Sequence, residues 1–294
     1  MAPGASILGP GRAGIGLLKC LANAPPWLGR AVGALMGFLL WHALRGRRKV
    51  ARRNLELCFP ELSAAARETL LRDSMRSVGL GGYEFVRAWW GPPIHESYTL
   101  SGLEHLEAER AKGRGILLLS GHFLTLELCG RMLCRHIPLA GMYRRHKQPA
   151  LERAVKAGRL GYADAMFARE ELRAAVKYVK RGGILWYAPD QDMRGKDAVF
   201  APFFGIPAST ITATHQMAKL TGAAVLPFFH RRGPDGSYVL RIGPALDSFP
   251  SDDAVADTAR VNGLIEAMVR EAPAEYLWIH KRFKSRPAGE ISVY

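Results

Sequence analysis

Short apolar runs alternate with segments of helical spacing through most of the chain after residue 97. The apolar runs predict strands at residues 98–100, 115–119, 137–143, 183–188, 223–229 and 237–242. The intervening spacing predicts helices at residues 103–112, 123–134, 149–159, 170–181, 210–220 and 252–271. This alternation predicts an α/β fold with a mostly parallel central sheet flanked by helices. Pro234-Asp235-Gly236 is a hairpin turn signal, so we expect the sheet to be mixed.

The N-terminal part has a different pattern. Residues 27–44 carry one formal charge, Arg30, and a tryptophan near each end. As a helix this segment is about 27 Å long, close to the roughly 30 Å of bilayer hydrocarbon. Basic residues follow the apolar run, the reverse of a cleaved signal peptide. We therefore expect residues 1–46 to form an uncleaved N-terminal membrane anchor helix, with the chain after it on the cytoplasmic side. The alternative is a helix kinked at Pro25-Pro26 that lies in the membrane surface.

Composition limits the remaining possibilities. The 294 residues are 48% hydrophobic and contain neither an internal repeat nor a low-complexity linker, which favours a single domain over residues 47–294. Helical spacing at residues 47–59 and 63–90 opens that domain. Of the net charge of +15, nine basic residues lie before Glu56, where no acidic residue occurs. The four cysteines have no paired spacing, so we expect neither disulfides nor a metal site.

A histidine stands directly after the second predicted strand, in the octapeptide Ser120-Gly121-His122-Phe123-Leu124-Thr125-Leu126-Glu127. Open α/β sheets bind ligands at the carboxyl edge of their strands. Within one helix His122 and Glu127 would point about 140° apart. If His122 lies in the turn, however, Glu127 can reach Nδ1 and leave Nε2 free as a base. The alternative is a satisfied structural pair. Ser120 lacks the nucleophile-elbow motif and is disfavoured as a nucleophile.

Two further loops follow predicted strands at the same edge. Arg144 follows the third strand, where a guanidinium can bind phosphate or stabilise an oxyanion. Asp190 and Asp192 follow the fourth strand. The structural alternatives are a solvated charge for Arg144 and backbone capping in a turn for the two aspartates. The C-terminal segment 275–287 interleaves aromatic and basic residues, a pattern that suits an anionic lipid surface or nucleic acid.

With these motifs the chain resembles the lipid A late acyltransferases (the HtrB/MsbB group) of the wider glycerolipid acyltransferase-like superfamily, over nearly its whole length. The resemblance rests on His122-x4-Glu127 and on residues 47–60, 142–144, 186–192, 199–205 and 275–287.

The resemblance implies a late acylation in lipopolysaccharide biosynthesis. An acyl chain moves from the phosphopantetheine of acyl carrier protein to a hydroxyl of an acyl chain on a lipid A precursor. It implies the cytoplasmic face of the bacterial inner membrane, no bound cofactor, no metal and no nucleic acid. It implies His122 as general base with Glu127 as acidic partner. Arg144, Arg159, Asp190 and Asp192 correspond to substrate-binding or oxyanion positions of the family. The reaction needs a donor for the oxyanion, and we expect it to be Arg159 or backbone N–H groups at the start of the helix after His122.

Two other functions also fit the sequence. One is an acyltransferase that acts on glycerophospholipid with acyl-CoA or acyl carrier protein. The other is a non-catalytic basic binding protein at a membrane, for which nucleic-acid binding would show steep salt dependence.

Overall fold

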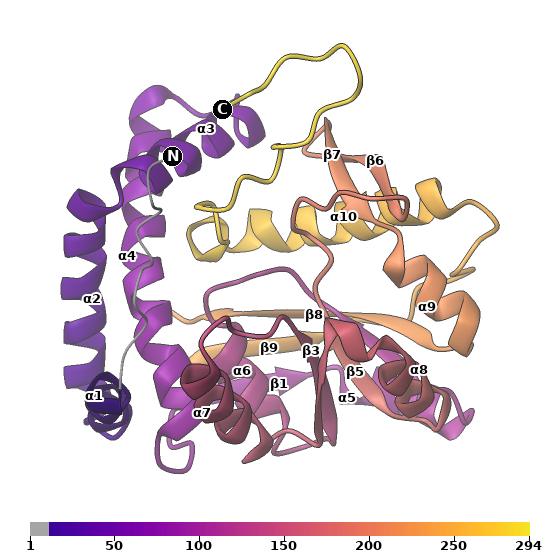
Figure 1. Ribbon diagram of the computed structural model, residues 1–294, viewed down its shortest axis with the longest axis horizontal. Helices are drawn as coiled ribbons and strands as arrows, with labels where there is room; N and C mark the ends of the chain where they lie inside the picture. Colours follow the sequence, from indigo (N-terminus) through magenta and orange to yellow (C-terminus); the bar gives the residue numbers. More distant parts are fainter. Residues whose placement is uncertain (1–11) are drawn as a thin grey trace.

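The computed structural model describes residues 12–294. A central sheet lies between helical layers, and helices α1 to α4 stand together at one side, on the left in Figure 1. The C-terminal segment returns across the molecule toward α3.

The central sheet has seven strands in the order β1-β9-β8-β2-β5-β3-β4. They are β1 (Tyr98–Ser101), β2 (Ile116–Leu119), β3 (Leu139–Tyr143), β4 (Ala165–Ala168), β5 (Ile184–Tyr187), β8 (Ala224–Arg232) and β9 (Tyr238–Ile242). All neighbours are parallel except β8 and β9, which form an antiparallel hairpin around the turn at residues 234–236. The predicted mixed, mostly parallel sheet is confirmed.

Both faces of the sheet are buried, as the apolar run of β2 requires. Ile116 and Leu118 belong to one hydrophobic cluster together with side chains of α5 and α6. Leu117 and Leu119 belong to the other, with side chains of α8, α9 and α10. Alternate residues of a strand point to opposite faces, so a strand covered by helices on both sides is apolar throughout.

The helices that flank the sheet agree with the sequence pattern to within a few residues. They are α5 (Leu103–Ala111), α6 (Leu126–Leu133), α7 (Pro149–Leu160), α8 (Leu172–Lys180), α9 (Ala213–Thr221) and α10 (Ala254–Glu271), with short 3-10 turns at Arg169–Glu171 and Pro273–Glu275. The start of α10 is fixed by Asp253, whose side chain accepts hydrogen bonds from the backbone of Val255 (2.8 Å) and Ala256 (3.1 Å).

Three strands were not predicted from the sequence pattern. One is the edge strand β4. The others, β6 (Ala198–Phe203) and β7 (Ile206–Ile211), form a separate antiparallel ladder. Their two-residue turn has positive φ at Phe204 (52°) and Gly205 (74°), which suits a tight hairpin. Pro202 and Pro207 face each other in this ladder. Proline is uncommon inside strands, so a strand that contains one is difficult to predict from sequence.

The N-terminal helices are α1 (Arg12–Ala22), α2 (Pro26–Ala43), α3 (Arg45–Cys58) and α4 (Ala64–Trp90). In Figure 1 α2 lies alongside α4, and glycines form the contact between them. A Cβ placed on Gly79 of α4 would overlap the backbone of Gly33 and Gly37 of α2. The two helices therefore pack backbone against backbone, as small residues at every fourth position allow.

The predicted membrane-spanning anchor is not confirmed. Within residues 12–294 no single helix is both long and apolar enough to cross a bilayer. Helices α2 and α3 reach that threshold only as a pair, and they are bent by 93° relative to each other. The apolar run ends with α2 at Ala43, and the basic cluster continues in the different direction taken by α3.

The glycine contact gives a stability prediction. Gly79→Leu is expected to destabilise the protein by about 1–3 kcal/mol or more, because the new side chain fits only if α2 moves away. Gly46→Leu is the matched control, since a Cβ at Gly46 on α3 meets nothing within 4 Å. Denaturant unfolding followed by circular dichroism measures both, and equal midpoints for the two variants would refute the close packing of α2 on α4.

Candidate active site

His122 lies in the turn between β2 and α6, at the carboxyl edge of the sheet. The helix begins at Leu126, three residues later than the pattern predicted, so His122 is outside it as the proposed chemistry requires. The C-terminal segment supports this turn. The backbone N–H of Leu124 donates to the carbonyl of Glu275 (2.8 Å), and that of Leu277 donates to the carbonyl of His122 (3.1 Å).

The side chain that orients His122 is Asp190. Its Oδ1 lies 2.6 Å from Nδ1 of His122, and its Oδ2 accepts the backbone N–H of the same residue at 2.9 Å. Asp190 follows β5, which is the parallel neighbour of β2, so the two carboxyl ends meet. Asp190 is only 1% exposed, whereas the His122 side chain is 30% exposed. Bonding at Nδ1 leaves Nε2 as the free nitrogen.

Electrostatics favour a charged pair. Burial alone would lower the pKa of His122, but the negative charge of Asp190 and its hydrogen bond outweigh burial, so the pKa is raised above its usual 6.5. Burial would raise the pKa of Asp190, yet the histidine and its hydrogen bonds hold that pKa well below the usual range. The carboxylate therefore stays ionised while the imidazole titrates.

The predicted contact between His122 and Glu127 is wrong. The Glu127 carboxylate instead forms an ion pair with Arg159 of α7, and it accepts hydrogen bonds from Nε1 of Trp89 (2.7 Å) and the hydroxyl of Tyr162 (3.2 Å). Because α6 starts at Leu126, Glu127 lies in its first turn, and its side chain extends toward α4 and α7 rather than back to the histidine.

Arg159 is a half-buried cation beside this carboxylate. Its guanidinium carbon lies 5.6 Å from the ring centre of Trp89 and 5.5 Å from that of Tyr143. Burial alone would lower the pKa of Arg159, but Glu127 raises it, so the guanidinium remains charged. The aromatic rings and the ion pair together fix the orientation of the guanidinium.

These groups share one cavity of about 430 Å³, within the size range of small-molecule pockets. His122, Glu127, Arg144 and Arg159 are among the polar residues of its lining. Most of the wall is apolar and includes Phe85, Leu126, Leu139, Gly141, Met166 and Trp186. The cavity therefore offers a base and a cation beside a space suited to a hydrocarbon chain.

The other predicted site residues occupy different positions. Arg144 is an exposed lining residue of the cavity. Asp190 does not line the cavity and acts on it by its hydrogen bond to His122. Asp192 is not part of the cavity wall, because its carboxylate accepts the backbone N–H (2.9 Å) and hydroxyl (3.1 Å) of Ser285. Asp192 thus ties the C-terminal segment to the loop after β5.

The C-terminal segment matches the surface predicted from sequence only in part, because Lys284 is exposed whereas Phe283 and several neighbours are buried. Its alternation of aromatic and basic residues suggested a surface for lipid or nucleic acid, but Tyr276, Trp278 and Arg282 are buried. Arg282 donates to the carbonyl of Ser209 (2.8 Å) and to the hydroxyl of Thr210 (2.6 Å), which anchors the segment to β7. The segment therefore supports the His122 turn from inside.

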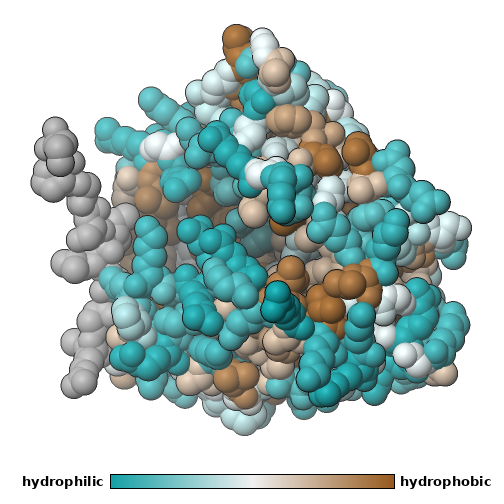
Figure 2. Space-filling view, turned by 45° about the vertical axis from the view of Figure 1, so that its right-hand side comes forward, coloured by the Kyte–Doolittle hydropathy of each residue, from teal (hydrophilic) through white to brown (hydrophobic). Residues whose placement is uncertain are grey.

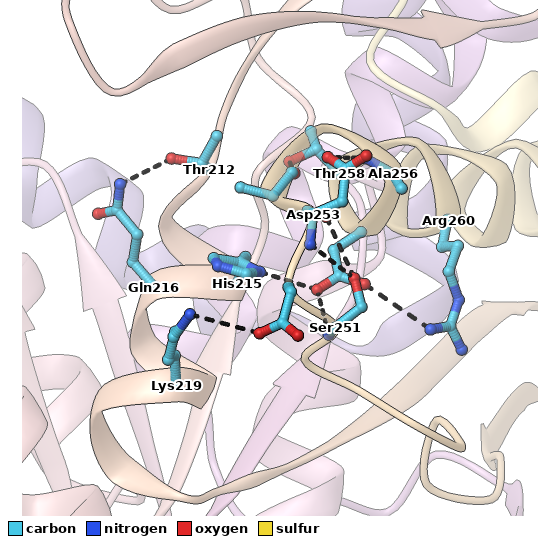
Figure 3. Close-up of polar contacts among 12 residues, drawn as sticks. Thr212, His215, Gln216, Lys219, Ser251, Asp253, Ala256, Thr258 and Arg260 are labelled. Carbon is cyan, nitrogen blue, oxygen red and sulfur yellow. Dashed lines mark hydrogen bonds and ion pairs between the residues drawn. The ribbon is translucent and has the colours of Figure 1, made fainter.

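A second histidine–aspartate pair serves as an internal comparison. Nδ1 of His215 lies 2.8 Å from Oδ2 of Asp257, and this pair joins α9 to α10 (Figure 3). The same Asp257 oxygen accepts the backbone N–H of Ser251 at 2.8 Å. His215 does not line the His122 cavity, and its bond to Asp257 joins two helices, which indicates a structural role. What distinguishes His122 is its access to a cavity.

Within residues 12–294 no group of three or more His, Cys, Asp or Glu side chains is placed to hold a metal ion.

The fold and the site define an α/β protein with a carboxylate-oriented histidine in a largely apolar cavity. The family of bacterial lipid A biosynthesis acyltransferases matches residues 7–285. Lipid A biosynthesis lauroyltransferase of Escherichia coli (strain K12) is 38% identical over 285 residues, covering 96% of this chain and 93% of that protein. The chain therefore belongs to the bacterial lipid A biosynthesis acyltransferase family, as its motifs predicted.

Other relatives also match nearly the whole chain but have different named activities. Lipid A biosynthesis palmitoleoyltransferase of Escherichia coli is 36% identical, covering 96% of this chain and 93% of that protein. The myristoyltransferase of the same organism is 26% identical, covering 96% and 88%. The crystal structure of 1-acyl-sn-glycerophosphate acyltransferase from Thermotoga maritima overlaps with a TM-score of 0.40 at 15% identity, covering 83% of this chain and 97% of that one. Family membership supports an acyltransferase of lipid A biosynthesis.

Proposed function

We propose that this protein transfers a fatty acyl chain from the thioester of acyl carrier protein to a hydroxyl on an acyl chain of a lipid A precursor. The observation that carries the proposal is the His122–Asp190 pair beside a largely apolar cavity in a chain of this family. The donor thioester belongs to the phosphopantetheine of the carrier, so the reaction needs no resident cofactor.

The chemistry follows from the free nitrogen of His122. A hydroxyl of ordinary high pKa is a weak nucleophile, so a base must remove its proton as it attacks. Nε2 takes that proton while the oxygen bonds to the thioester carbonyl carbon. Collapse of the tetrahedral intermediate breaks the C–S bond, and the departing sulfur receives the proton from Nε2. Asp190 holds the tautomer and stabilises the transient imidazolium.

Arg159 is the better of the two oxyanion donors considered from the sequence. Three backbone N–H groups of the turn already have acceptors: His122 donates to Asp190, Phe123 to Gly121, and Leu124 to Glu275. Arg159 uses Nε and Nη2 on Glu127, and within residues 12–294 its Nη1 makes no hydrogen bond. A fixed guanidinium in the cavity wall is the kind of group that stabilises developing negative charge.

In this assignment Glu127 positions Arg159 and does not contact the base, His122. Arg159→Gln is expected to lower kcat by about 10²–10³-fold, the usual cost of losing an oxyanion donor. Glu127→Gln is expected to lower kcat by a smaller factor, because the guanidinium loses its ion pair but stays in place.

A pH profile distinguishes the two possible roles of Glu127. The base must be neutral, so kcat/KM falls as pH drops through the raised pKa of His122. Glu127→Gln should leave that limb in place because Glu127 does not contact the histidine. A shift of the limb to lower pH in Glu127→Gln would contradict the assignment and restore the predicted pairing with His122.

We also propose that the N-terminal helices rest on the inner membrane, at its cytoplasmic face. The outer side of α2 exposes Trp27 (67%), Leu35 (58%), Phe38 (63%) and Leu39 (55%), and the basic helix α3 follows. Apolar side chains beside cations suit an anionic membrane surface. In contrast, the face in Figure 2, where the α8 and α9 side comes forward, is mostly hydrophilic with small separate hydrophobic patches.

Vesicle flotation tests the membrane proposal. Leu35→Ser/Phe38→Ser is expected to weaken binding to vesicles of phosphatidylglycerol and phosphatidylethanolamine by about tenfold or more, since moving these two exposed side chains from water into the membrane contributes roughly 3 kcal/mol together. Leu172→Ser/Leu220→Ser removes two exposed leucines from α8 and α9 and is the control. Equal flotation of both double variants would place the membrane contact elsewhere.

The donor and acceptor are tested with detergent-solubilised protein. Acyl carrier protein and coenzyme A are loaded with the same chains of several lengths and offered with a tetra-acylated lipid A precursor. The proposal expects turnover with the carrier-bound chains at a higher kcat/KM than with coenzyme A. Turnover with coenzyme A alone and glycerophospholipid as acceptor would favour the alternative acyltransferase.

A further inference from the structure

A second cavity, of about 450 Å³, lies between the β6–β7 ladder, the loop after β5 and the C-terminal segment. We call it the basic pocket. Its lining includes Arg194, Phe200, Ser209, Lys284, Ser285, Arg286 and Glu290. None of these residues lines the cavity of His122.

The charges of the basic pocket are unbalanced. Its one acidic lining residue, Glu290, is already paired with Arg286. Arg286 also donates to the carbonyl of Pro207 (2.7 Å), and its buried Nε makes no hydrogen bond with residues 12–294. Arg286 is therefore held in place with one donor unused.

The other two cations of the basic pocket, Arg194 and Lys284, make fewer contacts with polar groups of the protein. Arg194 donates through Nε to the hydroxyl of Ser285 (3.0 Å), and neither terminal nitrogen of its guanidinium is bonded to any part of the chain that the structure describes. The exposed Lys284 forms no ion pair with residues 12–294. Two available cations beside a fixed guanidinium make a concave site for a phosphate group, which guanidinium and ammonium groups bind through charge-assisted hydrogen bonds.

The basic pocket shares its wall with the catalytic loop. Asp190, which orients His122, lies two residues before Asp192. The Asp192 backbone N–H donates to Nε2 of His280 (3.1 Å), and its carboxylate holds Ser285 in the pocket wall. A phosphate bound in the pocket is thus held by the segment that also positions the base.

We propose that the basic pocket binds a phosphate ester of one of the two substrates while the reacting groups meet at His122. This proposal rests on the proposed function, because both substrates carry phosphate esters. The acceptor glycolipid has them on its sugars, and the acyl carrier has one at the attachment of its pantetheine arm. Binding outside the chemical centre would fix orientation and lower KM rather than raise kcat.

Binding of inorganic phosphate tests the site without turnover. Isothermal titration in chloride buffer is expected to show saturable binding by the wild type. Arg194→Gln/Lys284→Gln should weaken it by about tenfold or more, because two charge-assisted contacts are lost. The control Arg173→Gln/Lys177→Gln removes the same charge from the exposed face of α8 and should bind as the wild type does. His122→Ala should also bind normally, so the result does not depend on the proposed reaction.

Kinetics identify which substrate is held. A raised KM for the phosphorylated acceptor in Arg194→Gln/Lys284→Gln, with kcat unchanged, supports the acceptor as the source of the phosphate. A raised KM for the acyl carrier supports the donor. Absence of saturable phosphate binding by the wild type, equal binding by the α8 control and the pocket variant, or unchanged KM values for both substrates would overturn the proposal.

Discussion

His122→Ala is expected to lower kcat for acyl transfer by about 10²–10⁴-fold, the usual contribution of a positioned general base. The substitution removes Nε2, and within residues 12–294 no other histidine that lines the cavity is oriented by a buried carboxylate. Steady-state release of the free thiol from the acyl carrier measures the loss.

His215→Ala is the control for this prediction. It also deletes an imidazole bonded to a buried aspartate, but at the contact of α9 and α10 (Figure 3). We expect it to lower the unfolding free energy by about 1–3 kcal/mol, because the buried Asp257 loses one of its hydrogen-bond partners, and to leave kcat per folded molecule unchanged. Comparable kcat values for His122→Ala and the wild type would remove His122 from the mechanism.

Asp190→Asn has the second large expected effect. An asparagine preserves the shape but offers an amide to Nδ1, which favours the wrong tautomer, and kcat is expected to fall by up to about 10⁴-fold. The substitution also removes the negative charge that raises the pKa of His122. The imidazole then loses its proton more readily, so the acidic limb of kcat/KM moves to lower pH.

Asp192→Asn serves as the matched control for Asp190→Asn. Its carboxylate contacts Ser285 rather than His122. We expect a modest loss of stability and an acidic limb at the position of the wild type. If Asp192→Asn moved the limb and Asp190→Asn did not, the assignment of the orienting carboxylate would be wrong.

Much of the scaffold follows from local pattern. The run before Ser120 is apolar at every position because both faces of β2 are covered, and its strand and the following turn were predicted on that ground. The β8–β9 hairpin followed from Pro234-Asp235-Gly236. Strands β6 and β7 were not predicted, because Pro202 and Pro207 interrupt their pattern.

The hydrogen bond between His122 and Asp190 could not be predicted from the local sequence pattern. His122 and Glu127 are close in sequence, which made their contact the natural expectation. Asp190 is 68 residues away in sequence and reaches His122 only because β2 and β5 are parallel neighbours, a fact of strand order. The sequence placed His122 and Asp190 at one sheet edge, but the carboxylate predicted at Nδ1 was Glu127 rather than Asp190.

The C-terminal segment shows a further limit of pattern. Aromatic and basic residues in alternation suit a solvated binding surface, yet Arg282 is buried because Ser209 and Thr210 satisfy its guanidinium. Partners so distant in sequence leave no local signal. The same holds for the contact of Leu277 with the backbone of His122.

The most direct test is the mass spectrum of acceptor lipids after incubation with purified protein and acyl-loaded carrier. Tetra-acylated lipid A precursor and 1-acylglycerol 3-phosphate are supplied together, with wild type and His122→Ala run in parallel. We expect a gain of one acyl unit on the lipid A precursor with the wild type and its near absence with folded His122→Ala. A gain on the glycerophospholipid alone, or equal gains with both proteins, would contradict it.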